Sequence, residues 1–71
     1  MKTLKIYKEN GEFVIEKINQ FNHSTKRYFV TEEGLKEGLE SYIPVMSEYE
    51  IEAVDDVWAI VINHLTEKGQ L

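Results

Sequence analysis

The segment Ser47–Lys68, SEYEIEAVDDVWAIVINHLTEK, decides how this chain folds. It contains the only tryptophan and the densest block of β-branched residues. Its large apolar residues recur at spacings of three and four, which is the repeat of an amphipathic helix. They are Ile51, Val54, Trp58, Val61 and Leu65. Ser47 and Glu50 match a helix capping box, and Gly69 is a suitable terminator. The pattern therefore predicts one helix over residues 47–68, with five large side chains that need cover in a core.

The first third of this segment also fits a strand. Glutamates at 48, 50 and 52 alternate with Tyr49, Ile51 and Ala53, which is typical of an edge strand. Asp55 would then cap a shorter helix that begins at Asp56 and ends at Lys68. The helical template explains five apolar positions and the strand template explains three. We therefore favour the long helix and keep a short fourth strand at 48–53 as the alternative.

The N-terminal part predicts a β-hairpin. Asn10-Gly11 lies between two alternating runs, and this pair favours a type I′ turn, which needs positive φ at both central residues. A two-residue turn fixes the register, so that Glu9 faces Glu12 and Leu4 faces Lys17. The face assigned to the core carries Leu4, Ile6, Phe13 and Ile15. The outer face carries Thr3, Lys5, Tyr7, Val14, Glu16 and Ile18.

A third strand and a first helix follow the hairpin. Residues 19–25 are polar and predict a loop, and residues 27–31, RYFVT, predict a third antiparallel strand, since a lone hairpin is marginal in water. Thr31 is a good N-cap for a helix with an apolar stripe, which Pro44 ends. The stripe consists of Leu35, Leu39, Tyr42 and Ile43. We expect a single α+β domain over residues 1–71, with a three-stranded antiparallel sheet packed against two C-terminal helices in the order β-β-β-α-α.

The composition limits the class of protein. The chain has 71 residues, of which 42% are hydrophobic and 30% charged, as in a folded domain. It has no cysteine, which excludes disulfides and thiolate metal sites. There is no signal-peptide pattern, and the longest apolar run, Val57–Ile62, is far shorter than the roughly 20 residues of a membrane span. We expect a cytoplasmic protein that does not contact a membrane.

No group of residues predicts catalysis. His23 and Ser24 are adjacent in the predicted loop, a placement that rarely gives the geometry of a nucleophile and its base. His64 and Glu67 lack the further ligands that a metal site on helices needs. The calcium-loop, Walker and Rossmann patterns are absent. We therefore expect no enzyme activity, no cofactor and no metal.

Charge is distributed unevenly along the chain. The total is −5, but residues 1–31 carry a net +3, whereas residues 32–56 carry nine acids against Lys36 alone. A domain this small often relies on a partner. We therefore expect a non-enzymatic protein-binding module, an inhibitor or adaptor, whose acidic residues 32–56 dock onto a partner protein with a basic surface. In general character the chain is similar to small acidic accessory proteins of phages and mobile elements.

The candidate partner-binding residues form two groups. The acidic group consists of Glu33, Glu37, Glu40, Glu48, Glu52, Asp55 and Asp56. The second group, on the less polar outer face of the hairpin, consists of Tyr7, Val14 and Ile18.

Two alternative functions remain open. The basic hairpin, with Tyr7, Tyr28 and Phe29, is compatible with a sheet that stacks nucleic-acid bases, although the RNP1 pattern is absent and the net charge disfavours it. The chain is also compatible with a homo-oligomeric structural protein. Three apolar residues lie off the stripe of the predicted long helix and suggest a second interface in a homodimer: Val57, Ile60 and Ile62.

Overall fold

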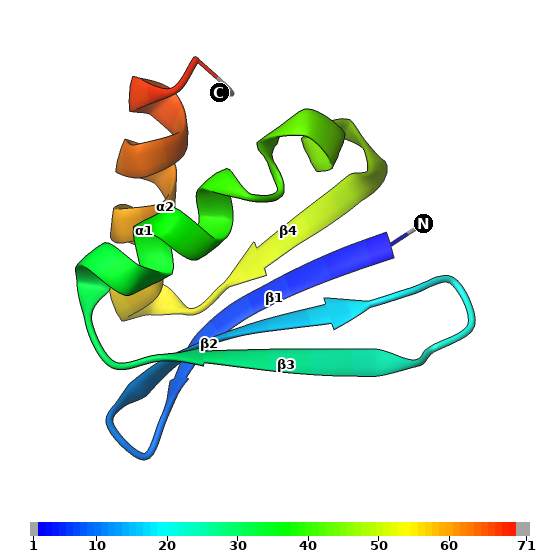
Figure 1. The fold of residues 1–71 in the computed structure, drawn as a ribbon, viewed down its shortest axis with the longest axis horizontal. Helices are drawn as coiled ribbons and strands as arrows, with labels where there is room; N and C mark the ends of the chain where they lie inside the picture. The colour runs from blue at the N-terminus through cyan, green and yellow to red at the C-terminus, as the bar shows by residue number, and fades with distance from the viewer. Residues whose placement is uncertain (1, 70–71) are drawn as a thin grey trace.

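The computed structural model describes residues 2–69, apart from the side chain of Asp55. The order of elements is β-β-β-α-β-α (Figure 1). They are strands β1 (Lys2–Glu9), β2 (Glu12–Ile18) and β3 (Ser24–Phe29), helix α1 (Glu32–Glu40), the 3₁₀ helix η1 (Ile43–Glu48), strand β4 (Tyr49–Ala53) and helix α2 (Asp55–Glu67). The four strands form one mixed sheet in the order β3-β2-β1-β4, with β4 parallel to β1.

One core joins the sheet to both helices. The buried residues are Leu4, Ile6, Phe13, Ile15, Leu35, Leu39, Met46, Val57, Val61 and Leu65. The four hairpin residues predicted for the core are among them. Because α1 and α2 contribute to the same core, the molecule has two layers, helices on one side and the sheet on the other (Figure 1). No helix within residues 2–69 has the length and apolar character needed to cross a membrane.

The predicted hairpin is confirmed in its turn and register. Asn10 and Gly11 both have positive φ, 52° and 80°, as a type I′ turn requires. Glu9 pairs with Glu12 and Leu4 with Lys17, as the two-residue turn demands. A shift of one residue in the register would move every side chain to the other face of the sheet. Because the turn fixes the register, the face predicted for the core is the one that is buried.

The prediction of a single helix over residues 47–68 is wrong, and the short strand is the correct alternative. Residues 49–53 form β4, with Tyr49, Ile51 and Ala53 packed against the core and the intervening glutamates exposed. Pairing with β4 satisfies the backbone groups of β1 on the side away from β2. A helix over these residues would leave that edge of β1 unpaired, so the long-range pairing outweighs the local helical pattern.

The core face of helix α2 is predicted only in part, since Val61 and Leu65 are buried as expected but Val54 and Trp58 are not. Val57, Val61 and Leu65 are fully buried, whereas Trp58 is 45% exposed and Val54 is 51% exposed. The reason is the later start of the helix, since Val54 is its N-cap and has an extended backbone. Trp58 and Val54 are therefore not core residues, and Val57 is not available for the second interface that was predicted for a homodimer.

Strand β3 begins earlier than predicted and ends earlier. The Asn19 side-chain oxygen accepts hydrogen bonds from the backbone N–H groups of Phe21, at 2.9 Å, and His23, at 3.1 Å. With Asn22 at φ 64°, these bonds close the loop by residue 23. The strand therefore runs over Ser24–Phe29 and not over residues 27–31.

Helix α1 begins as predicted and ends earlier. The Thr31 hydroxyl accepts a hydrogen bond of 3.0 Å from the N–H of Gly34, which confirms it as the N-cap. The Ser41 hydroxyl donates to the carbonyl oxygen of Gly38 at 2.6 Å, and the helix ends at Glu40. Pro44 therefore lies within η1 and not at the end of α1.

Candidate functional site

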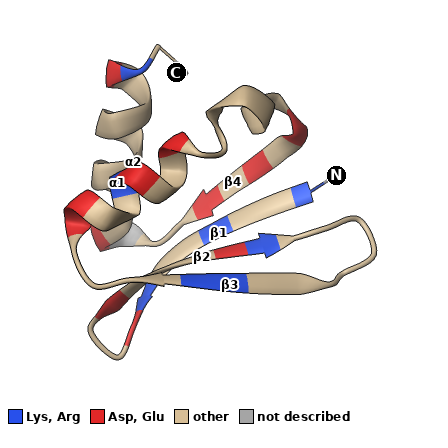
Figure 2. Ribbon diagram, viewed as in Figure 1, with Lys and Arg blue, Asp and Glu red and all other residues tan. Residues whose placement is uncertain are grey.

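The acidic segment 32–56 is divided between the two layers of the fold. Figure 2 shows acidic positions on both α1 and β4. Glu33 and Glu37 are exposed on α1, which belongs to the helical layer. Glu50 and Glu52 are exposed on β4 and face away from the core, because their neighbour Ile51 packs against it. The acids that are continuous in sequence thus form separate groups on opposite sides of the sheet.

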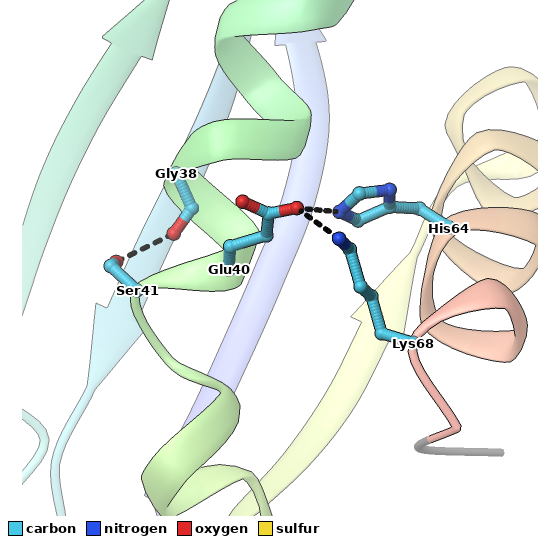
Figure 3. A network of polar contacts seen from close by, with 5 residues as sticks. All are labelled: Gly38, Glu40, Ser41, His64 and Lys68. Carbon is cyan, nitrogen blue, oxygen red and sulfur yellow. Dashed lines mark hydrogen bonds and ion pairs between the residues drawn. The ribbon is translucent and has the colours of Figure 1, made fainter.

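Two of the predicted acidic residues are engaged within the chain. Glu40 Oε1 lies 3.0 Å from Lys68 Nζ and 3.5 Å from His64 Nε2 (Figure 3). The contact with the Lys68 ammonium, helped by His64, lowers the pKa of the Glu40 carboxyl. Glu48 Oε1 lies 3.0 Å from Lys2 Nζ, and this contact raises the pKa of Lys2. The charges of these two carboxylates are therefore partly compensated within the chain.

The remaining predicted acids lie near the start of α2 and on β4. Asp56 is exposed in the first turn of α2, where the helix dipole favours a negative charge. Asp55 is the first residue of α2, and its side chain lies outside the described part of the structure. Among the ion pairs between described residues, none involves Glu50 or Glu52. These two glutamates are therefore not held in an ion pair with a described residue, although Glu52 lies opposite Lys5 in the register.

The outer face of the sheet is less exposed to solvent than its sequence suggests. Val14 is fully buried, because Tyr7 and Tyr28 flank it from the two neighbouring strands in register. Tyr7 donates a hydrogen bond of 3.1 Å to Glu16, and Tyr28 donates one of 3.2 Å to Glu9. Burial and the bond to Glu16 raise the pKa of the Tyr7 hydroxyl. Of the three predicted residues here, only Tyr7 and Ile18 retain some exposure.

One row of this outer face crosses all four strands with alternating charge. In register it consists of Glu52, Lys5, Glu16 and Lys26. Each lysine therefore has a carboxylate on a neighbouring strand, an arrangement that favours the sheet. A phosphate backbone binds best to a surface of one positive sign. The basic residues of the hairpin do not form such a surface along this row.

A hollow of about 420 Å³ opens between η1, β4 and α2. Its apolar lining includes Met46, Tyr49, Ile51, Trp58, Ile62 and Leu65. A second shallow hollow next to it is lined by Ile51, Glu52, Ala53 and Trp58. Trp58 thus lines both hollows, and the 420 Å³ hollow is called the apolar groove below.

Glu50 and Trp58 are exposed, although neither is among the candidate partner-binding residues predicted from the sequence. Glu50 was treated as part of a capping box, and Trp58 as part of the core stripe. The alternation of glutamates with apolar residues over 48–53 is the pattern that indicates an exposed Glu50 on a strand. The spacing of four residues between Val57, Val61 and Leu65 is the pattern that indicates a buried stripe without Trp58.

The two histidines lie in different settings. His23 is exposed in the loop before β3, whereas His64 is buried in α2 and approaches Glu40. Within the side chains that the structure describes, no three histidine or carboxylate groups are arranged to hold a metal ion.

Comparisons of the chain with protein-family models, with curated protein sequences and with solved structures give no match.

Proposed function

We propose that this chain is a non-enzymatic protein-binding module, an inhibitor or adaptor, that docks onto a basic partner protein. The docking surface is the β4 surface, which we define as Ile51, Glu50, Glu52 and Trp58. One observation carries the proposal. Two exposed carboxylates that form no ion pair with a described residue lie on the outer face of the edge strand β4, and a half-exposed tryptophan and the apolar groove lie on its inner face.

This combination matches the anatomy of a protein interface. Tryptophan is among the residues most enriched at binding hot spots, where a large aromatic side chain is surrounded by a polar rim. Leaving 45% of Trp58 exposed keeps apolar surface in water, which disfavours the free state. A partner that covers the ring would remove this cost, and its basic residues would meet the two glutamates.

The acids of α1 supply a matched control. Glu33 and Glu37 are exposed, and neither takes part in an ion pair between described residues. Replacing both by glutamine changes the net charge by as much as replacing Glu50 and Glu52. The double variants Glu50→Gln/Glu52→Gln and Glu33→Gln/Glu37→Gln therefore separate the β4 surface from acidity in general.

The test is affinity capture from a lysate of the native host, followed by purification of the captured protein and titration at low and high salt. We expect a partner with a basic surface to bind the wild-type chain and the α1 variant, and to bind the β4 variant several-fold more weakly. Affinity should fall as salt rises. Equal loss in both variants would contradict the β4 surface as the docking site.

The same material tests the two alternative functions. A steep, salt-dependent affinity for DNA or RNA alone would favour the basic hairpin as a nucleic-acid site. A mass in light scattering that doubles with concentration would favour a homo-oligomeric protein. Either result, without a protein partner, would overturn the proposal.

A further inference from the structure

Strand β4 has one free edge. It pairs with β1 on one side and is the last strand of the sheet on the other. The N–H of Val54, directly after the strand, donates to the carbonyl oxygen of Ile6 in β1 at 3.2 Å. Successive residues of a strand direct their backbone groups to opposite sides, so the N–H and C=O groups of Ile51 and Ala53 point away from β1. An edge of this kind is a template for a further strand.

The two faces beside this edge differ in chemistry. On the inner side, Ile51 and Ala53 border the hollows that Trp58 lines. On the outer side, Glu50 and Glu52 are exposed and form no ion pair with a described residue. A strand added here would present alternate side chains to an apolar surface and to two carboxylates.

We infer that an extended segment of the basic partner adds to β4 as a further strand of the sheet. Its apolar side chains occupy every second position and pack beside Ile51 and Trp58. Its lysines or arginines occupy the positions between and face Glu50 and Glu52. This inference rests on the proposed function and names the recognition mode of the same surface, which is β-strand addition.

Charge argues against a second copy of the chain at this edge. Symmetric antiparallel pairing of two β4 strands centred on Ile51 would place Glu50 of one copy opposite Glu52 of the other, twice. Carboxylates directly opposite each other destabilise a strand pair. The other free edge, β3, carries Lys26 toward the outer face but Arg27 toward the inner one. An arginine there is a poor match for the apolar groove.

The probe is a synthetic peptide of roughly nine residues in which lysine and valine alternate, long enough to cover β4. A second peptide of the same composition, with the lysines and valines in separate blocks, is the control. Binding is followed by the backbone amide signals of Ile51 and Ala53 in NMR spectra and by their hydrogen exchange. We expect the alternating peptide to bind with a Kd below about 1 mM and to protect both amides.

Two N-methylated versions of the alternating peptide test for strand pairing. If the added strand is antiparallel, the valine amides donate to β4 and the lysine amides point away; if it is parallel, the roles reverse. Methylation of one set should therefore abolish binding, and methylation of the other should leave it unchanged. Equal affinities for both methylated peptides, or no binding of the parent peptide, would overturn strand addition.

The protein variants separate this inference from the proposed function. Glu50→Gln/Glu52→Gln should weaken the alternating peptide roughly five- to tenfold, while Glu33→Gln/Glu37→Gln should not. If the captured partner depends on Glu50 and Glu52 but neither methylation pattern matters, strand addition is wrong and the docking surface stands. If the captured partner ignores these glutamates, the proposed function itself fails.

Discussion

The ring of Phe29 in β3 lies directly against the backbone of α1 at Gly38. A Cβ atom added to Gly38 would stand 2.8 Å from Cε1 of this ring and closer still to Cζ. Gly38 is itself buried, and Phe29 packs on the edge of the core. The Phe29 ring therefore occupies the space that a Cβ atom at residue 38 would need.

Gly38→Ala should destabilise the protein by about 1–3 kcal/mol, because the ring or the helix must shift. This loss opposes the gain of about 1 kcal/mol that alanine brings to a helix. Gly34→Ala is the comparison, since its Cβ would lie 3.3 Å from Thr31 Oγ1 and 3.6 Å from Phe29 Cβ. Urea denaturation of both variants should show the larger loss for Gly38→Ala. Equal stabilities would contradict the close contact with Phe29.

Trp58→Ala should cost about 1–2 kcal/mol, because only about half of the side chain is removed from water. Leu65→Ala, at a fully buried position, should cost about 2–5 kcal/mol. Urea denaturation followed by circular dichroism compares the two. A loss at Trp58 as large as that at Leu65 would mean that the tryptophan belongs to the core. Free access of acrylamide to the Trp58 fluorescence is an independent check on its exposure.

Local signals in the sequence predicted much of the fold. The Asn10-Gly11 turn, the hairpin register and the Thr31 cap each depend on residues close together in the chain, so a short window contains the needed information. The exposure of acidic residues such as Glu33, Glu37 and Glu52 was also expected, because charged side chains rarely enter a core.

The strand β4 depended on a distant partner. Residues 49–53 fit both a helix and a strand, and the choice is made by β1, at the other end of the chain. The same choice sets where α2 begins. The long-helix interpretation therefore placed Trp58 in the core and gave Glu50 a helical capping role, whereas Trp58 is half-exposed and Glu50 lies on β4. The wrong helix and the wrong placement of these two residues thus have one physical cause.

Thr31→Ala should destabilise the protein by about 1 kcal/mol, within the range of 0.5–2 kcal/mol for lost N-caps. The Thr31 hydroxyl accepts the N–H of Gly34, which has no other partner within the first turn of α1. Thr31→Ser keeps the oxygen and should retain most of the stability. Urea midpoints of the three proteins provide the measurement. Equal losses in the serine and alanine variants would show that the methyl group, and not the hydrogen bond, matters.

Lys68→Gln should change the pH dependence of stability on the acidic side. Lys68 holds the pKa of the Glu40 carboxyl below its ordinary value in the folded protein. A carboxyl with a lower pKa in the folded state stabilises that state above the pKa of the unfolded chain. This contribution disappears as the pH falls through the folded pKa. Without Lys68, the pKa of Glu40 in the folded protein should come closer to its value in the unfolded chain. The free energy of unfolding should then decrease less steeply as the pH is lowered.

Lys17→Gln is the matched control for this change, because Lys17 is exposed and has no ion pair among the described residues. Carbon-detected NMR titration should show the pKa of Glu40 rising in Lys68→Gln and staying constant in Lys17→Gln. The urea midpoint, followed from neutral pH downward, should fall less steeply only in Lys68→Gln. An unchanged Glu40 titration would mean that the 3.0 Å contact with Lys68 does not persist in solution. Because His64 approaches the same oxygen at 3.5 Å, a partial rise in Lys68→Gln would assign the remaining stabilisation of the carboxylate to the imidazole.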